Sequence, residues 1–312
     1  MGGTDSGGTA TGGRPFGGVT ASGGANGSSS TGGMMTGGSF AGGTMTGGSK
    51  SGGTRTAGAM ASGGAIGGSV SGGSASSGGS TYGTHSQPTP ITNGTSGFTT
   101  RYWDCCKPAC GWAANSHNKP TKTCGKDGTS TVDGNTQSAC SGGSAYMCYW
   151  GAPWSVSDTL SFGFAAFGDT SNCGLCFQLQ FTGQGKYNGK DPGSAALNGK
   201  TMIVQVINTG DISSNQFDLL IPGGGVGQNN ACTYGSAQWS GADIGDTNGG
   251  MLTTCKDDKS CVQQKCQAAF GDKPQLLAGC NWVTGWFSAA EDPVIVYQKV
   301  ACPPEISAKS GE

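Results

Sequence analysis

The stretch TTRYWDCCKPACGW, residues 99–112, decides how this chain is interpreted. It places one carboxylate, Asp104, between an aromatic pair and the adjacent cysteines Cys105 and Cys106, with Cys110 close behind. Disulfides from these cysteines would hold long loops in place. A carboxylate in such surroundings is fixed by its neighbours, so it is either a catalytic group or a structural hydrogen-bond acceptor.

Two parts of the chain differ sharply in composition. Residues 1–97 hold more than half of the 62 glycines, no cysteine, no tryptophan and few charged side chains. All 14 cysteines and all seven tryptophans come after them. We therefore expect one globular domain over residues 98–312, preceded by a low-complexity linker rich in Gly, Ser and Thr over residues 1–97.

The glycine-rich tract has no strict Gly-X-Y period, which excludes collagen. Glycine flanked by serine and threonine cannot bury enough apolar surface to offset its backbone entropy, so we expect a disordered tether. We interpret it as a passive spacer. The alternative is a linker to a binding module that lies upstream of this chain.

Fourteen cysteines is an even number and a high density for one domain, and it is typical of an oxidised, secreted protein with seven disulfides. A zinc site is the weaker alternative. The chain has only two histidines, His85 and His117, and its one CxxC motif (Cys173 to Cys176) lacks a second. No metal constellation stands out, and we expect no cofactor.

The net charge of −1 argues against a nucleic-acid partner and suits a neutral substrate. No apolar run is long enough to span a membrane. The opening MGGTDSGGTA lacks the basic start and the apolar stretch of a signal peptide. Since the cysteines require export, we expect the sequence to be trimmed or to be a fragment.

The domain is predicted to be mainly β with short helices and long loops. Runs rich in β-formers lie at residues 176–181, 201–208, 217–222 and 293–302, and turn residues separate them. Helical patterns are found at residues 261–271 and 155–167.

Carboxylates are the catalytic candidates that remain. The domain has one histidine, so it has no Ser-His-Asp set, and IPGGGVG (221–227) lacks the ending of a phosphate-binding loop. Asp104, Asp211 and Asp218 stand beside aromatic or glycine-rich segments. Two acids flanking a bound sugar are the minimum for glycoside hydrolysis, although a single Asp at a strand end is more often a cap or a turn residue.

TTRYWDCCKPACGW resembles closely the signature of the family 45 glycoside hydrolases, the small inverting endoglucanases. The segments SGGSAYMCYWGAPWSVSDTLSFGFAA, NTGDISSNQFDLLIPGGGVG and NWVTGWFSAAEDPVIVYQKVACP follow in the family's order. The resemblance covers about residues 98–307. It implies a six-stranded double-psi β-barrel with long disulfide-held loops, and a secreted enzyme that cuts β-1,4-glucan (cellulose) within the chain.

The resemblance also implies roles for individual residues. Asp104 would be the general base that activates water, Asp218 the general acid that protonates the leaving oxygen, and Asp211 an auxiliary acid. Tyr102, Trp103, Trp112 and Lys107 would bind substrate, with a solvated surface lysine as the alternative for Lys107. We expect a monomer that acts on a β-1,4-glucan polysaccharide, with the tract as a possible tether to an upstream carbohydrate-binding module.

The cysteines depart from the family pattern in a paired way. Gly174 stands where a cysteine is expected, and ISAKSGE lacks its partner, whereas Cys255 and Cys261 are extra. The pairs implied are 105–232, 106–140, 110–173, 124–148, 176–302, 255–261 and 266–280, with the pairing among the last four cysteines left open. Gln216 replaces a histidine that is frequent in the family, which changes what can titrate beside the acid.

Three other classes compete with this interpretation. Non-catalytic expansin-like wall-loosening proteins share the barrel but lack the base, and Asp104 is present here. The same two acids could cut xyloglucan, mannan or mixed-linkage glucan, and the sequence does not separate these substrates. A purely structural glycine-rich protein fits the tract but not the domain.

Overall fold

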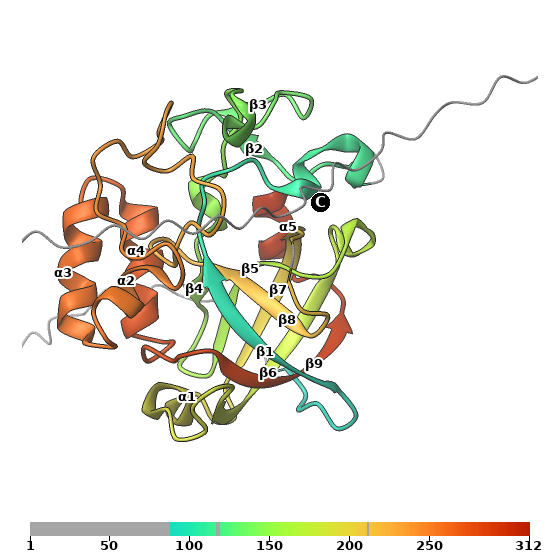
Figure 1. Cartoon of the computed structure of the whole chain (residues 1–312). Coiled ribbons are helices and arrows are strands. Elements are labelled where there is room, and N and C mark those ends of the chain that lie inside the picture. Colours follow the sequence, from blue (N-terminus) through green and yellow to red (C-terminus); the bar gives the residue numbers. More distant parts are fainter. Residues whose placement is uncertain (1–87, 117–118, 211) are drawn as a thin grey trace, which may run out of the picture. The chain divides into compact units, whose positions relative to one another are not determined.

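The computed structural model describes residues 88–116, 119–210 and 212–312, which belong to a unit spanning 75–312 (Figure 1). Residues 1–87 of the predicted disordered tract lie outside these residues. Residues 88–97 are described, and residues 95–97 begin a strand, so the predicted disorder is wrong there. Among them, no helix is both long and apolar enough to cross a bilayer. The described part is mainly β, with short helices, as the sequence predicts. Its strands are β1 Thr95–Tyr102, β2 Thr123–Cys124, β3 Thr131–Val132, β4 Trp154–Ser155, β5 Leu160–Ala166, β6 Cys176–Gly185, β7 Thr201–Asn208, β8 Gln216–Leu220 and β9 Pro293–Val300.

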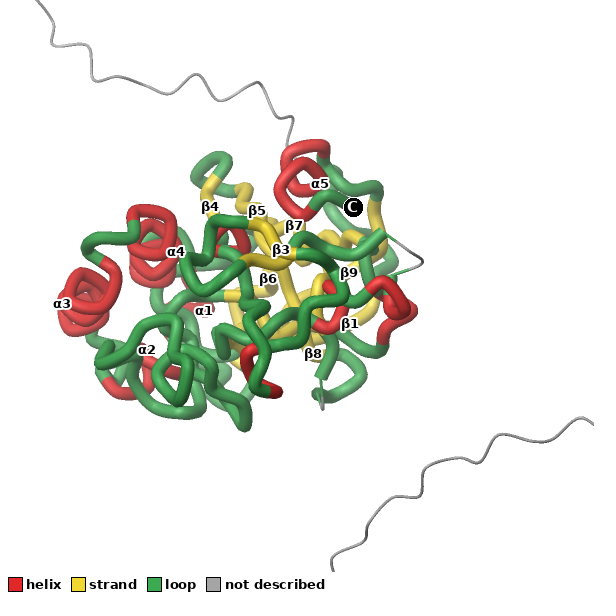
Figure 2. The backbone as a smooth tube through the Cα atoms, turned by 90° about the horizontal axis from the view of Figure 1, so that it is seen from above, coloured by secondary structure: helices red, strands yellow, loops and turns green. Residues whose placement is uncertain are grey.

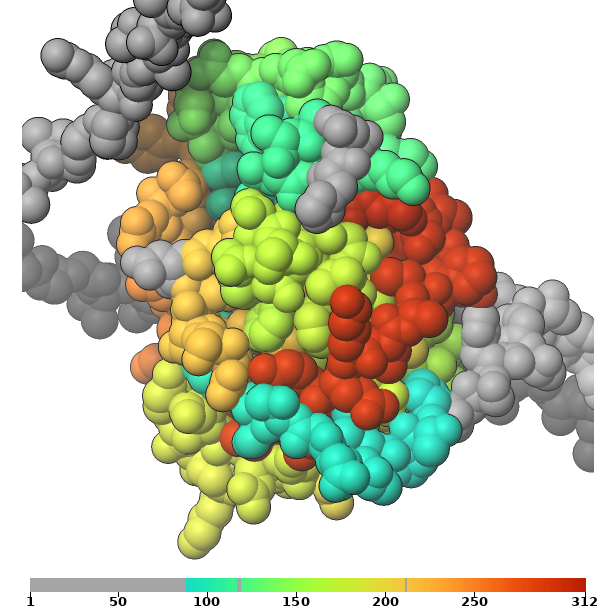
Figure 3. All heavy atoms as spheres, turned by 90° about the vertical axis from the view of Figure 1, so that its right-hand side faces the viewer, coloured from blue at the N-terminus to red at the C-terminus, as the bar shows by residue number. Residues whose placement is uncertain are grey.

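Six strands pair in a ring. The order in the sheet is β4-β5-β7-β6-β9-β1-β8, and β8 pairs again with β5 through Ala165↔Leu219 and Ala166↔Asp218. The β1–β8 and β5–β7 pairs are parallel, and the other pairs of the ring are antiparallel. β1 therefore lies between β8 and β9, which come much later in the chain. Figure 3 shows this juxtaposition from outside, with the first described residues against the C-terminal ones.

The predicted helix at residues 155–167 is wrong, because Leu160–Ala166 forms β5 and all seven of its residues are buried. A strand covered on both faces has a nearly continuous apolar sequence, which resembles a buried helix when periodicity alone is considered. The four predicted strands are found as β6, β7, β8 and β9. β1 was not among the predicted strands.

Helices gather on one side of the strands in both Figure 1 and Figure 2, where α2, α3 and α4 lie together. The predicted helix at 261–271 is found as α3, whose N-terminus is capped by Asp258. α4 begins with proline at its first turn, a favoured position that the sequence interpretation missed. The helices of the described residues are α1 Pro192–Ala196, α2 Gly250–Thr254, α3 Lys259–Phe270, α4 Pro274–Thr284 and α5 Pro304–Ser310.

Seven disulfides join the 14 cysteines, which all lie in the described residues, and the seven expected pairs are found. The four C-terminal cysteines form Cys255–Cys261 and Cys266–Cys280. Cys173 and Cys176, the CxxC pair, belong to two different disulfides. The cysteines of the stretch 99–112 bind three distant segments, through Cys232, Cys140 and Cys173.

Aromatic side chains form a tight cluster in the core. Phe167 stacks on Phe217 with ring centroids 4.0 Å apart, and Phe177 and Tyr297 meet both rings edge-on. Such pairs add to the free energy of burial. Since Phe217 precedes Asp218 on β8, this cluster fixes the strand that carries one candidate acid.

Candidate active site

A groove of about 580 Å³ brings together most of the predicted site residues. Asp104 and Asp218 both line it, although 114 positions separate them in the chain. Tyr102, Lys107 and Trp112 line it too. The sequence motifs at 99–112 and 208–227 are therefore parts of one site.

Asp104 follows the end of β1, and its carboxylate is held by a local turn. The residue after it, Cys105, has a φ of 62°, which is rare for a residue with a side chain. This conformation lets the backbone N–H of Cys106 donate to Asp104 Oδ1 at 2.9 Å. Asp104 is 8% exposed, and this burial raises the pKa of its carboxyl to about 6, against the opposing effect of the Cys106 bond.

Asp218 projects from β8 beside β1. In the parallel register Asp218 pairs with Thr100, and the Thr100 hydroxyl donates to Asp218 Oδ1 at 2.8 Å. Burial raises the pKa of the Asp218 carboxyl to about 7, and the negative charge of Asp104 acts in the same direction. The Thr100 bond and the positive charge of Arg101 oppose this rise. Asp218 therefore holds its proton to a higher pH than Asp104 does.

The phenol of Tyr102 interacts electrostatically with both acids, Asp104 and Asp218. Burial raises the pKa of its phenol well above the usual value, and the charges of Asp104 and Asp218 add to this effect. Its hydroxyl accepts a hydrogen bond from Asn208 Nδ2 at 2.8 Å. Asn208 also accepts one from the backbone N–H of Ala109 at 2.7 Å. Asn208 thus links the end of β7 to the stretch 99–112.

Trp112 is a half-buried aromatic side chain in the groove wall, and Lys107 supports it from one face. Lys107 Nζ lies 3.4 Å from the centroid of the Trp112 ring and donates to the carbonyl oxygens of Gly134 and Thr136. Lys107 is 5% exposed, so the alternative of a solvated surface lysine is wrong. The ammonium orients a flat aromatic face beside the groove.

Trp103 does not line the groove, and the expectation that it contacts substrate is wrong for this structure. It is 1% exposed and stacks on Trp239 with centroids 6.1 Å apart. Successive side chains of an extended segment point to opposite sides, so Tyr102 and Trp103 cannot both face the groove. Trp103 instead packs under the segment that carries Asp104.

Asp211 lies outside the described residues. Its neighbours Gly210 and Ile212 both line the groove. The auxiliary role expected for Asp211 therefore stays a prediction.

Thr100 and Asn208 are polar residues of the site that the sequence did not single out, whereas Gln216 was noted only as a replacement for a frequent histidine beside the acid. A period-two signal could have found Thr100, because it alternates with Arg101 and so shares a strand face with Tyr102. The hydrogen-bond partners of Gln216 and Asn208 could not be found from the sequence, since they come from segments that meet only in the folded chain.

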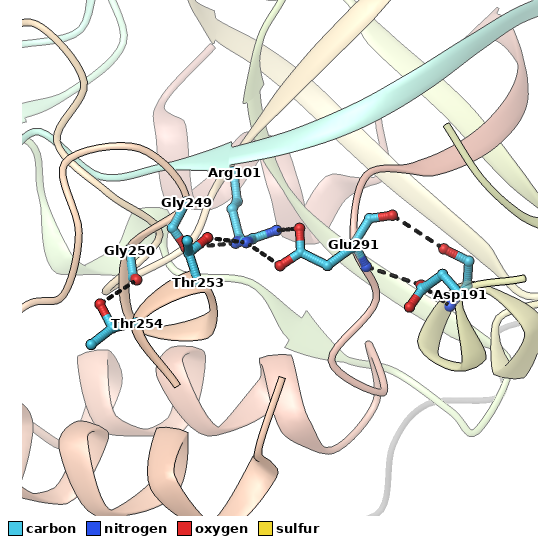
Figure 4. A network of polar contacts seen from close by, with 8 residues as sticks. Arg101, Asp191, Gly249, Gly250, Thr253, Thr254 and Glu291 are labelled. Atoms are coloured by element: carbon cyan, nitrogen blue, oxygen red, sulfur yellow. Dashed lines mark hydrogen bonds and ion pairs between the residues drawn. The ribbon is translucent and has the colours of Figure 1, made fainter. Parts of the chain in front are cut away.

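Arg101 anchors β1 on the side where the helices lie (Figure 4). Its guanidinium pairs with both carboxylate oxygens of Glu291, at 2.7 and 3.1 Å, and donates to the Gly249 carbonyl at 2.9 Å. Asp191 in turn accepts from the backbone N–H of Glu291 at 3.1 Å. This bidentate pair is largely buried, so its geometry fixes Thr100 and Tyr102 on either side of Arg101.

Comparison with known proteins defines the class. The family model described as Glycosyl hydrolase family 45 matches residues 96–312. The chain belongs to this family and is a glycoside hydrolase whose relatives are named endoglucanases.

The similar proteins come from distant organisms. Endoglucanase B of Cellvibrio japonicus is 47% identical over 243 residues, covering 72% of this chain and 47% of that protein. An endoglucanase of Cryptopygus antarcticus is 39% identical over 229 residues, covering 70% of this chain and 89% of that protein. The chain thus spans about half of the bacterial relative and most of the springtail one.

A solved structure is similar as well. The crystal structure of the cellulase from the Antarctic springtail Cryptopygus antarcticus superposes with a TM-score of 0.57 at 39% identity, covering 71% of this chain and 97% of that one. The mainly β fold with short helices is therefore the fold of that cellulase.

Proposed function

We propose that this chain is a secreted endo-β-1,4-glucanase that hydrolyses cellulose chains by an inverting mechanism with two carboxylates. One observation carries the proposal: Asp104, which is buried, and Asp218, which is half-buried, share one groove, and Asp218 has the higher pKa. An acid and a base with separated pKa values are what glycoside hydrolysis requires.

The roles follow from the two environments. Between about pH 6 and 7, Asp104 is mostly ionised and Asp218 mostly protonated. Asp104 is then the general base that removes a proton from the attacking water, and Asp218 the general acid that protonates the leaving glycosidic oxygen. Because the two carboxylate charges interact, the pair titrates with two apparent pKa values, and each of them belongs to the pair as a whole.

An inverting enzyme attacks from the face opposite the leaving group and leaves room for one water. Its two carboxyl groups then stand roughly 6.5–9.5 Å apart. We propose that Asp211 assists as an auxiliary acid, so that Asp211→Asn slows the reaction less than a change of either main acid.

The groove fits a neutral polysaccharide as substrate. Trp112, backed by Lys107, offers a flat aromatic face on which a glucose ring stacks. Endo cleavage is supported by the relatives, which are named endoglucanases. Xyloglucan, mannan and mixed-linkage glucan are the competing substrates.

The wider architecture is part of the proposal. We infer that the ring of six paired strands is the double-psi β-barrel that the resemblance implies. Seven disulfides support secretion, since thiols stay reduced in the cytosol. We propose a monomer, with residues 1–97 as a spacer toward a carbohydrate-binding module.

The test measures sugar release from a panel of soluble β-glucans, with Asp104→Asn and Asp218→Asn as matched controls. Carboxymethylcellulose viscosity should fall quickly while few reducing ends appear, and both variants should lose nearly all turnover. Proton NMR of the first product should show the α-anomer. A β-anomer appearing first would exclude inversion, and full activity of either variant would remove that carboxylate from its role.

A further inference from the structure

Three hydrogen bonds lead in series to Asp218. The backbone N–H of Ser213 donates to Gln216 Oε1 at 3.2 Å, and Gln216 Nε2 donates to Thr100 Oγ1 at 2.8 Å. The Thr100 hydroxyl then donates to Asp218 Oδ1 at 2.8 Å. The parallel register of β1 and β8 makes this series possible, because it pairs Phe98 with Gln216 and Thr100 with Asp218.

The direction of the series is fixed by chemistry. A backbone N–H can only donate, so the amide oxygen of Gln216 must face Ser213 and its NH₂ group must face Thr100. A threonine hydroxyl has a single proton. Thr100 Oγ1 accepts from Gln216, and the structure has its single proton donated to Asp218 Oδ1.

We propose that Gln216 is a positioning residue for the general acid: it locks the Thr100 hydroxyl as a donor to Asp218 Oδ1, so that the transferable proton of Asp218 resides on Oδ2. The inference rests on the proposed role of Asp218. A carboxyl that shares its proton between two oxygens presents it to the leaving group only part of the time. A carboxyl with one oxygen already accepting a hydrogen bond carries the proton on the other.

The surroundings allow this series to be tested without disturbing the fold. Gln216 and Asp218 are half-buried, and with Thr100 they line a cavity of about 360 Å³. This cavity and the substrate groove share Tyr102 and Asp218. A change at position 216 therefore meets open space rather than a packed core.

The other charged groups around Asp218 stay the same in such variants. Asp104, Tyr102 and Arg101 face it from β1 and the segment that follows, and Asp292 faces it from the turn before β9. Ala166, its partner on β5, has no charge. Gln216→Leu adds no charge, so a shift in its pH profile reports on the series of hydrogen bonds.

Gln216→Glu has the same shape but reverses one bond, and its added negative charge also raises the pKa of Asp218. The uncharged Gln216→Leu is therefore the decisive variant. A carboxylate at 216 still accepts from Ser213, but it also accepts from Thr100 and draws the hydroxyl proton away from Asp218. Gln216→Leu removes the donor, Thr100→Val removes the hydroxyl, and Thr100→Ser restores it. The pH dependence of kcat and kcat/KM on carboxymethylcellulose is measured for each variant and for Thr100→Val/Gln216→Leu.

Loss of a donor to the ionised carboxylate raises its pKa. We expect the basic limb to move up by about one pH unit in Thr100→Val and Gln216→Glu, and by less in Gln216→Leu. In Gln216→Glu, kcat at the optimum should fall about tenfold, a part of the roughly 10²–10⁴-fold that a general acid contributes. Thr100→Ser should keep the wild-type profile. Adding Gln216→Leu to Thr100→Val should change nothing further, because both act through one hydroxyl.

Two results would overturn the proposal. One is an unchanged basic limb in both Gln216→Leu and Thr100→Val. A lower melting temperature or a higher KM alone would then report only a structural role. The other is simple additivity in the double variant. Asp218→Asn distinguishes a failure of this proposal from a failure of the proposed function. If Asp218→Asn stays active, Asp218 is not the general acid. If it is inactive while Gln216→Leu keeps the wild-type pH profile, only the positioning role of Gln216 is refuted.

Discussion

The backbone N–H of Cys106 donates to the carboxylate of Asp104 two positions earlier, because Cys105 between them has a left-handed conformation. The disulfide from Cys105 to Cys232 ties this turn to a loop 127 positions away. The question of whether Asp104 is structural or catalytic therefore has a double answer in our proposal. One oxygen makes a structural bond, and that bond orients the carboxylate for its proposed chemistry.

Removing the Cys105–Cys232 bridge should affect both stability and rate. For the variant Cys105→Ala/Cys232→Ala we expect a loss of about 2–5 kcal/mol in unfolding free energy, since a long loop is released in the unfolded state. We also expect kcat to fall, because the turn that orients Asp104 loosens. Chemical denaturation and initial rates measure the two effects.

The matched control is Cys255→Ala/Cys261→Ala, which opens a loop with a sequence separation of only 6. It should cost less stability and leave kcat unchanged. Equal losses of rate in both variants would contradict the local role of Cys105.

Activity should follow a narrow bell-shaped pH profile. The base must be ionised, so the rate should rise with pH through about 6, and the acid must be protonated, so it should fall above about 7. The profile of kcat/KM on a soluble glucan measures both limbs. A rate that stays flat from pH 5 to 9 would contradict the assignment of these two groups.

Replacing Asp218 should stabilise the fold at alkaline pH. Its pKa in the folded chain, about 7, lies above the ordinary value of 3.8, so the folded state binds the proton more tightly than the unfolded state does. Stability is therefore lost as the pH rises from about 4 through 7. Relative to wild type, Asp218→Asn should gain roughly 1–4 kcal/mol between pH 4 and pH 8.

Urea unfolding of both proteins at the two pH values checks this prediction. Asp133→Asn on the surface serves as a charge-matched control. A gain that is the same at pH 4 and pH 8 would mean that the effect is not linked to the proton of Asp218.

Trp112 and Lys107 should act as a unit in substrate binding. Trp112→Ala should raise KM for long glucans with little change in the pH profile, because it removes a stacking surface and no titrating group. Lys107→Met should raise KM too and cost about 1–3 kcal/mol in stability, since the carbonyls of Gly134 and Thr136 lose their donor.

Tyr234→Ala is the control for these variants, because Tyr234 is an exposed aromatic residue outside the groove lining. It should keep the wild-type KM. Additive effects of Trp112→Ala and Lys107→Met on KM would show that they act separately.

A chain that begins at Pro88 should keep full activity on soluble substrate, whereas one that begins at Phe98 should melt at a lower temperature. The compositional boundary at 97/98 falls inside β1, where Thr95 pairs with Tyr297. Ile91 and Thr89 also bond the side chains of Gln180 and Gln178. Thermal unfolding and viscosity assays of both chains measure the difference, and equal melting temperatures would show that these contacts add nothing.

Local pattern predicted four strands, β6 to β9, and the family resemblance implied the disulfide pairs that the structure shows. The prediction failed for β5, because a strand buried on both faces does not alternate apolar and polar residues. It also failed for Trp103, which was expected to bind substrate because it stands beside an acid. The hydrogen bonds of Thr100, Gln216 and Asn208 could not be predicted from the sequence. They depend on how distant segments pair in the folded chain, which no single segment determines.

The position of β1 between β8 and β9 has a consequence for how the protein is made. The strand that leads to Asp104 is the first strand of the described residues, yet its two partners, β8 and β9, are the last two in chain order. Such high contact order slows folding, because the entropy of closing the loop is lost before any native contact is gained. The pairing of β1 with β9 can therefore form only after β9 has been synthesised, so the strand that leads to Asp104 acquires its second neighbour late.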